Sequence, residues 1–437
     1  MRTKLISGFV GALGLISTFA ASAQKMENIP SDPYYAKFHP IAAPSAKKNF
    51  LKANDRLAIC GDSITEQKRY SRIMETYLTV CQPELDIAVR QYGWSGEKAS
   101  GFLRRMTNDC LRFKPTIATT CYGMNDHEYR AFEERIGRSY ATNMTGVVEA
   151  FKANGVRVVL GTAGTVGKKP SWVGDPKATI EDMNYNLAEL RNIDIRIAKD
   201  ERVALADIFW PMLIAGHDMQ IRYDGKFAVS GKDGVHPDWA GHVVMAYEFL
   251  HSFGINGSIG TFTMDLRSGK ATATAGHEVV NAKKGEVELK SSRYPFCVGE
   301  GNASQDNTIF AGTLLVPFNE ELNRFMLVAK HANGKSYRVT WGDQSKSFTG
   351  EQIGKGINLA AEFPVNPFSD AFKKVDQAVA AKQAYETKQI QGIFHGAEGK
   401  ADMEAAVTKS EAEREPLAAA IKTAFVPVTH TIKIVAE

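Results

Sequence analysis

The stretch Leu57-Ala58-Ile59-Cys60-Gly61-Asp62-Ser63-Ile64-Thr65-Glu66 decides the fold that the sequence predicts. Its first four residues form a short apolar run, which is typical of a buried strand that ends at Cys60. A glycine, an acid and a serine follow directly. In a parallel α/β sheet, ligands bind at the carboxyl ends of the strands. We therefore expect Ser63 to stand at the functional edge of a sheet, where it is a candidate nucleophile.

Predicted strands alternate with predicted helices around this stretch. The strands are expected at residues 57–60, 85–91, 116–121, 156–160 and 203–205. The helices are expected at residues 69–81, 98–113, 133–153, 181–199 and 239–250. Such alternation is typical of a parallel sheet that is covered by helices on both faces. The sequence thus predicts an α/β protein whose residues 51–257 form a flavodoxin-like, three-layer α/β/α domain.

The pattern changes after residue 257, and residues 258–437 are predicted to form a β-rich accessory domain. Short strands are expected at residues 261–266, 277–289, 308–317, 324–331, 336–341 and 346–348. Asn333-Gly334 lies between two of these strands and predicts a hairpin turn. Residues 370–387 and 401–425 are rich in Ala, Lys and Glu and predict a helical hairpin. The last segment, 426–435, alternates like a strand and is expected to rejoin the β-sheet.

The first 23 residues have the pattern of a secretory signal peptide. Arg2 and Lys4 precede a short apolar run, and Ala21-Ser22-Ala23 is a small-x-small cleavage site. The apolar run is short for a membrane-spanning helix, and no later stretch reaches about 18 apolar residues. We expect an exported, periplasmic or secreted protein with no stable membrane insertion. Residues 24–50, which are polar and contain four prolines, are expected to form an N-terminal arm.

The charge and the cysteine content of the chain indicate which classes of partner and ligand to expect. The net charge is +4 and becomes +2 once the predicted signal peptide is removed. The charges are mixed, without a basic block, which argues against nucleic acid as a partner. The five cysteines show neither CxxC nor Cys/His ligand spacing, so we expect no zinc site. Pairing of Cys81 with Cys110 in an oxidising compartment stays open.

Three further segments carry chemistry at predicted strand ends. Gln91-Tyr92-Gly93-Trp94-Ser95-Gly96-Glu97 is a glycine-dense loop that would present free amide donors. Tyr122-Gly123-Met124-Asn125-Asp126 offers the side-chain NH₂ of Asn125, a donor that can stabilise an oxyanion. In Asp233-Gly234-Val235-His236-Pro237, an acid precedes a histidine by three residues around a glycine turn. Such an acid can accept from Nδ1–H and leave Nε2 facing outward, as in a Ser-His-Asp triad.

Together the four segments resemble the blocks of the SGNH (GDSL-type) hydrolase family, and the likeness extends to its secreted bacterial carbohydrate esterases and acetylesterases. It covers roughly residues 55–253 and implies the α/β/α fold. The resemblance implies that Ser63 is the nucleophile, His236 the general base and acid, and Asp233 the residue that orients the histidine. It also implies an oxyanion hole formed by the Ser63 amide, the Gly96 amide and the Asn125 side chain. The chain departs from the family at one position, because many members have asparagine where Gln91 stands.

Candidate substrate contacts lie beside these blocks. Asp62, Trp94 and Tyr122 are the candidates, and the two aromatic rings, together with Trp172, could stack on a sugar ring. A different role is also open to Asp62, which, like Asp126, could fix its loop through hydrogen bonds to nearby amides.

The leading hypothesis is an exported serine ester hydrolase that deacetylates a polysaccharide or oligosaccharide through an acyl-enzyme. Its partner would be an acylated carbohydrate, and the chemistry requires neither a metal nor a cofactor. One alternative is a lipase or lysophospholipase on the same triad, although the loops 67–70 and 123–129 are polar and aromatic rather than aliphatic. The other is a non-catalytic glycan-binding protein. The oligomeric state stays open.

Overall fold

The computed structural model describes residues 25–46 and 50–437. The chain forms two compact units, one that ends at Ala42 and one that spans Ala43–Glu437. The predicted signal peptide lies outside the described residues. Within the described part of the chain, no helix combines the length and the apolar character that crossing a membrane requires. The predicted domains 51–257 and 258–437 lie in one compact unit, so their division stays a prediction.

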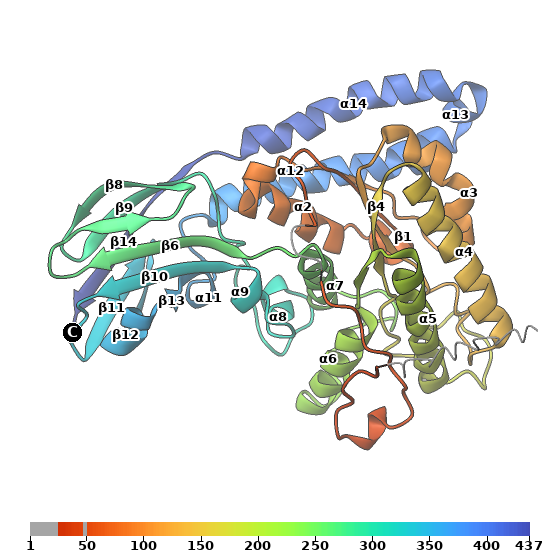
Figure 1. Ribbon diagram of the computed structural model, residues 1–437, viewed down its shortest axis with the longest axis horizontal. Helices are drawn as coiled ribbons and strands as arrows, with labels where there is room; N and C mark the ends of the chain where they lie inside the picture. The colour runs from red at the N-terminus through yellow and green to blue at the C-terminus, as the bar shows by residue number, and fades with distance from the viewer. Residues whose placement is uncertain (1–24, 47–49) are drawn as a thin grey trace, which may run out of the picture. The chain divides into compact units, whose positions relative to one another are not determined.

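A five-stranded parallel sheet forms the centre of the first half of the larger unit (Figure 1). Its order is β2-β1-β3-β4-β5. The strands are β1 (Arg56–Gly61), β2 (Ala88–Gln91), β3 (Ile117–Cys121), β4 (Arg157–Gly161) and β5 (Ala204–Ala206). The helices are α1 (Ser63–Glu66), α2 (Tyr70–Cys81), α3 (Ala99–Asp109), α4 (Glu134–Ala153), α5 (Ile180–Glu201), α6 (Phe209–Arg222) and α7 (Trp239–Ser252). In Figure 1, α2 and α7 lie on one side of the sheet and α3, α4 and α5 on the other, which confirms the predicted three-layer α/β/α fold.

The burial of the strands follows from the sequence. Every residue of β3 is buried, and β1 is buried apart from its first residue. Strands that are buried along nearly their whole length fit a sheet with a helical layer on each face. The edge strand β2 is less buried and is shorter than predicted. It begins only at Ala88, because Pro83–Leu85 form a 3₁₀ turn that ends at Asp86 in the left-handed region (φ 43°).

Two further sheets follow in the second half of the larger unit. One has the order β13-β10-β6-β7 and the other β12-β11-β14-β9-β8. The strands are β6 (Ser258–Asp265), β7 (Ala271–Ala273), β8 (His277–Lys283), β9 (Glu286–Ser291), β10 (Arg324–Lys330), β11 (Ser336–Trp341), β12 (Gln344–Thr349), β13 (Ile357–Asn358) and β14 (Val428–Ala436). The C-terminal segment β14 pairs with β9 and β11, so the prediction that it rejoins a sheet is confirmed.

Two sequence predictions in this region are wrong. Asn333-Gly334 does not close a hairpin, because β10 pairs with β6 and β13 whereas β11 pairs with β12 and β14. The turn carries the chain from one sheet to the other, and Phe325 and Trp341, one from each sheet, stack with ring centroids 5.5 Å apart. The strand predicted at 308–317 is also absent. Thr308 instead caps the helix α8 (Ile309–Gly312), since its hydroxyl accepts from the Ala311 amide at 3.2 Å.

The remaining helices include the predicted helical hairpin. They are α9 (Phe318–Glu321), α10 (Gly350–Lys355), α11 (Leu359–Glu362), α12 (Ser369–Thr387), α13 (Ala397–Ala401) and α14 (Met403–Ala424). Short turns of helix are η1 (Pro33–Tyr35), η2 (Pro83–Leu85), η3 (Leu111–Phe113) and the π-helical η4 (Lys388–Phe394). We call residues 369–424 the helical hairpin. Its first helix, α12, packs on α2, and α14 returns along α12 (Figure 1).

All five cysteines are free and buried. Cys81 and Cys110, whose pairing the sequence left open, therefore form no disulfide in the structure. Burial raises the pKa of the Cys81 thiol well above its ordinary value, which keeps it protonated. These cysteines act as small apolar side chains of the core.

Candidate active site

Ser63 begins α1 directly after the first strand of the sheet. Asp62 caps this helix, because its Oδ1 accepts from the Ile64 amide at 3.0 Å. The side chain of Ser63 is half-buried at the carboxyl end of β1. The position is the one that the sequence predicted for a candidate nucleophile.

His236 connects Ser63 to an acid. Its Nε2 lies 2.8 Å from Ser63 Oγ, and its Nδ1 lies 2.7 Å from Asp233 Oδ2. An ionised carboxylate can only accept, so Nδ1 carries the proton and Nε2 is free to accept from the serine hydroxyl. The side chains of His236 and Asp233 are 28% and 39% exposed, so solvent reaches both. The structure thus brings together the three residues that the sequence singled out as a triad.

The pKa of Asp233 lies below its ordinary value. Burial alone would raise this pKa, but the backbone amides of His236 and Val235 donate to Oδ1, each at 2.9 Å, and the His236 ring donates to Oδ2. These donors favour the charged form of Asp233. Asp233 is therefore held as a carboxylate, the form that accepts from Nδ1 and orients the histidine.

The backbone around His236 is fixed by close approach. Gly234 has a φ of +86°, and a Cβ at this position would collide with the backbone of Lys168. Glycine is therefore required for the turn between the acid and the histidine. From the serine side, Arg69 donates to the carbonyl of Pro237 at 2.9 Å, which ties the histidine loop to the start of α2.

Two of the three predicted oxyanion donors, the Gly96 amide and the Asn125 side chain, come from the loops that follow β2 and β3, the two neighbours of β1. We call residues Gln91–Glu97 the glycine loop. Within it Gly96 adopts a φ of +72°, and no atom lies within 4 Å of the place that a Cβ would take. Asn125 Nδ2 donates to the carbonyl of Glu97 at 3.1 Å, so the two predicted donor segments are in contact. Their role in stabilising an oxyanion stays a prediction.

Two buried carboxyl groups brace these loops. Asp126 accepts from the amides of Gly123 (3.1 Å) and Ala99 (3.1 Å), and burial raises its pKa to about 6. Burial also raises the pKa of Asp62 to about 7; the Ile64 amide opposes this rise, and the nearby charges of Asp126 and other acids add to it. Both carboxyl groups therefore titrate near neutral pH. Asp62 is only 2% exposed. The role that its contacts show is to cap α1 rather than to contact a substrate.

The two aromatic candidates for substrate contact, Tyr122 and Trp94, differ in their burial. Tyr122 is fully buried, stacks on Phe102 and donates to Glu97 Oε2 at 3.1 Å, so its ring offers no face to a substrate. Trp94 is half-buried and packs edge-on against His395 of the helical hairpin, with centroids 4.9 Å apart. Tyr122 is therefore part of the protein interior, whereas Trp94, which is partly exposed, stays a candidate for substrate contact.

Another aromatic pair faces the site. Trp172 is 50% exposed, and its ring centroid lies 6.0 Å from that of His236. Tyr129 meets Trp172 edge-on at 5.9 Å and donates from its hydroxyl to Asn125 Oδ1 at 3.3 Å. The sequence indicated Trp172 as a candidate and the loop 123–129 as polar and aromatic, but it did not single out Tyr129, which lies in the left-handed turn at Glu128-Tyr129.

The sequence and the fold are similar to those of known proteins. Residues 59–244 match the model of the GDSL-like Lipase/Acylhydrolase family. They are an SGNH (GDSL-type) hydrolase domain. The SGNH domain makes the chain a hydrolase of the esterase type. No curated protein matches the sequence.

Solved structures show how far the fold extends. A gut microbial diltiazem-metabolizing enzyme is similar over 90% of this chain and 100% of its own, with 21% identity and a TM-score of 0.72. This likeness shows that the SGNH domain, the β-rich region and the helical hairpin together form a known fold. An acetylxylan esterase from Geobacillus stearothermophilus (22% identity, 47% of this chain and 96% of its own, TM-score 0.39) and an alpha/beta hydrolase enzyme from the metagenome of Lake Arreo, Spain (21%, 47% and 98%, 0.39) are similar over about half of the chain.

Among residues 25–46 and 50–437, no group of three or more His, Cys, Asp or Glu side chains is placed to hold a metal ion.

Proposed function

We propose that the protein is an exported serine esterase that removes acetyl groups from a polysaccharide or oligosaccharide. The observation that carries this proposal is the His236 ring, whose two nitrogens contact Ser63 Oγ and Asp233 Oδ2 at 2.8 and 2.7 Å. A serine that donates to a histidine, which in turn donates to a carboxylate, is the arrangement that activates a hydroxyl as nucleophile.

The proposed reaction has two halves. Ser63 Oγ attacks the ester carbonyl while its proton moves to His236 Nε2, and Asp233 stabilises the imidazolium that forms. The tetrahedral intermediate collapses when His236 gives the proton to the leaving sugar oxygen, which leaves an acyl-enzyme. Water, deprotonated by His236, then attacks the acyl carbon and releases acetate together with the free serine.

The oxyanion is proposed to lie between the amides of Ser63 and Gly96 and the side chain of Asn125. These groups follow three adjacent strands of the parallel sheet, and Asn125 already contacts the glycine loop. Donors that are held in place before the reaction stabilise charge without reorganisation. Removing one such donor typically lowers the rate by about 10²–10³.

An acetylated carbohydrate is the proposed substrate because of the surface around His236. The exposed face of Trp172 suits the apolar face of a sugar ring, and Tyr129 adds a hydroxyl beside it. Export, which the N-terminal residues predict, would place the enzyme where polymeric carbohydrate is found.

The first test compares hydrolysis of p-nitrophenyl acetate, butyrate and octanoate by the mature protein and by the Ser63→Ala variant. We expect acetate to be the best substrate and the variant to be inactive. A preference for octanoate would favour a lipase-type enzyme. Lack of hydrolysis by the wild-type protein on these esters, on acetylated polysaccharides and on diltiazem, the compound that the structurally similar enzyme metabolizes, would favour a glycan-binding protein.

A further inference from the structure

We infer that the helical hairpin is a positioning part of the active site, which holds the glycine loop and with it the Gly96 amide. The inference rests on the proposed function, in which this amide binds the oxyanion. The contacts of the hairpin run from the edge of the parallel sheet to the glycine loop.

Strand β2 is the outer strand of its sheet, and the hairpin occupies its free edge. The carbonyl of Val89 accepts from Lys382 Nζ at 2.6 Å and from Arg414 Nη2 at 3.1 Å. Two residues further on, the amide of Gln91 donates to Glu386 Oε2 at 3.1 Å. An edge strand otherwise leaves such groups unpaired, open to another strand. Here side chains of the hairpin take the place of that strand.

These anchors are buried charges. Lys382 and Glu386 are each 1% exposed, and Lys382 Nζ also lies 3.0 Å from Glu75 Oε1. Burial alone would raise the pKa of Glu386, but the charges of Lys382 and Arg414 lower it below its ordinary value, so the carboxylate is ionised. Removing one member of a buried ion group leaves an uncompensated charge, which is strongly destabilising. The hairpin therefore contacts this edge through a buried ion group, no member of which can be removed alone without a large cost in stability.

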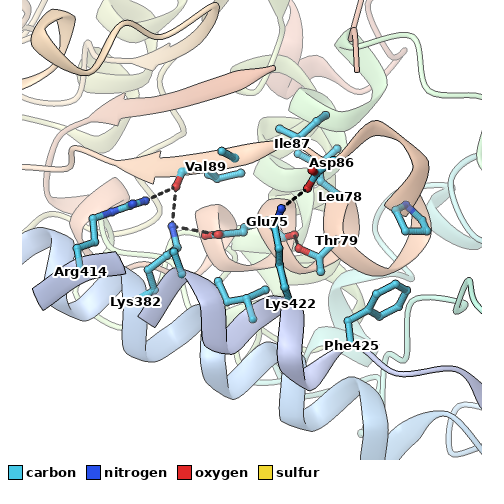
Figure 2. A pocket seen from close by; sticks show the side chains of 14 residues that line it. Glu75, Leu78, Thr79, Asp86, Ile87, Val89, Lys382, Arg414, Lys422 and Phe425 are labelled. Atoms are coloured by element: carbon cyan, nitrogen blue, oxygen red, sulfur yellow. Dashed lines mark hydrogen bonds and ion pairs between the residues drawn. The ribbon is translucent and has the colours of Figure 1, made fainter. Parts of the chain in front are cut away.

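Figure 2 shows the anchors from close by. Lys382 and Arg414 point at the carbonyl of Val89 beside a cavity of about 320 Å³, and Lys422 reaches Asp86 across its rim at 2.7 Å. Because of this cavity, α14 does not pack continuously on the sheet. Polar contacts to the strand, rather than a filled apolar interface, define where the hairpin sits here.

From the same edge the hairpin reaches the glycine loop directly. Gln91 Nε2 donates to Thr387 Oγ1 at 3.0 Å, while Gln91 Oε1 accepts from the amide of Gly93. Gln391 Nε2 donates to the carbonyl of Gly93 at 3.2 Å. Gln391 belongs to the π-helix η4, a rare helical form that frequently marks functional sites. The backbone of Gly93 is thus bonded on both its N–H and its C=O side.

The far end of the loop is held through a second chain of contacts. His395 Nε2 lies 2.8 Å from Asp109 Oδ2, and Asp109 contacts Arg105 Nη1 at 3.3 Å. Arg105 donates to both carboxylate oxygens of Glu97, each at 2.7 Å. Glu97 directly follows Gly96. The oxyanion amide therefore lies between two points, Gly93 and Glu97, that contact the hairpin directly or through one network.

The test removes one loop contact and compares it with an anchor that does not touch the loop. Gln391→Met keeps the length of the side chain and loses the donor to Gly93. The matched control is Asp376→Asn, which breaks the ion pair between α12 and Arg72 of α2. We expect Gln391→Met to lower kcat for p-nitrophenyl acetate about tenfold and to change KM by no more than about twofold. The decrease in kcat is smaller than the one expected when an oxyanion donor is removed outright, because the Gly96 amide is misplaced rather than lost. The control is expected to stay within about twofold for both.

Two further readouts separate positioning from stability. Inhibition by phenylboronic acid, whose adduct with Ser63 mimics the tetrahedral intermediate, should weaken about tenfold in Gln391→Met only. Amide hydrogen exchange at residues 93–97 should rise in the same variant, a result that does not depend on activity. Unchanged kcat and unchanged exchange would overturn the inference, as would an equal loss in the control. If the Ser63→Ala variant kept the activity of the wild-type protein, the proposed function would be refuted. The hydrogen-exchange experiment would still show whether the hairpin holds the glycine loop.

Discussion

Replacement of Asp233 by asparagine is the sharpest test of the triad geometry. The carboxylate accepts from His236 Nδ1 with one oxygen and from the amides of Val235 and His236 with the other. Asparagine can keep the two amide contacts through its carbonyl oxygen. Its NH₂ group then faces Nδ1, and because NH₂ only donates, the ring must move its proton to Nε2. The nitrogen that should accept from Ser63 is thereby blocked.

The size of the effect follows from two losses. A hydrogen bond to a charged group contributes about 1.5–3 kcal/mol, and here it stabilises the imidazolium. The wrong tautomer adds to this loss, and in a serine protease the same exchange lowers kcat about 10⁴-fold. Asp233 is 39% exposed, so water partly compensates for the missing charge. We expect kcat/KM for p-nitrophenyl acetate to fall by about 10³.

The matched control is Asp238→Asn in the same loop. Asp238 caps α7 by accepting from the Trp239 amide and pairs with Arg69 at 2.9 Å, but it does not contact the histidine. Asparagine caps helices as well as aspartate does, so this variant should keep its activity within about twofold. If Asp233→Asn folds normally and retains more than a tenth of the wild-type rate, the orienting role assigned to Asp233 is wrong.

Three further changes test the surroundings of the site and the core. Trp172→Ala should raise KM for an acetylated oligosaccharide about 2–10-fold with little change in kcat, since one stacked ring contributes about 0.5–1.5 kcal/mol; steady-state kinetics with p-nitrophenyl acetate as comparison measures this. Asp62, whose pKa is raised to about 7, holds a proton that the unfolded chain releases near pH 4, so stability falls as pH rises between these values. Asp62→Asn should therefore raise Tm more at pH 8 than at pH 4. Burial lowers the pKa of His430 to about 3. The unfolded chain binds a proton at this residue below about pH 6.5 and the folded chain does not, so stability falls as pH falls from 6.5 to 3. His430→Gln should flatten this loss in acid unfolding curves.

The fold and the contact of His236 with Asp233 could be predicted from sequence because local patterns determine both. Three of the four chemical blocks directly follow a strand, and parallel strands bring their carboxyl ends to one edge whatever the details of packing. The fourth block, residues 233–237, lies between α6 and α7. The acid and the histidine are three residues apart, so a single glycine turn brings them into contact. Prediction at these places needed no knowledge of distant contacts.

Features that depend on contacts between distant segments were missed. Tyr122 looked like a cleft residue because it follows β3, but its side chain turns inward onto Phe102. Asn333-Gly334 is typical of a hairpin turn, but in the structure the two strands beside it belong to different sheets, between which aromatic side chains pack. Local turn chemistry is compatible with both outcomes, and tertiary packing selects one of them.

Gln91 shows how such a distant contact can leave a trace in the sequence. At this position the family resemblance leads one to expect asparagine, and the longer glutamine is a departure that the sequence alone does not explain. In the structure the glutamine amide contacts two partners, the Gly93 amide through Oε1 and Thr387 of the hairpin through Nε2. A partner that lies outside the SGNH domain, at the free edge of β2, needs the additional reach. Gln91 is thus the residue that joins the glycine loop to the helical hairpin. The glutamine in place of asparagine is explained by the hairpin that covers this edge of the sheet.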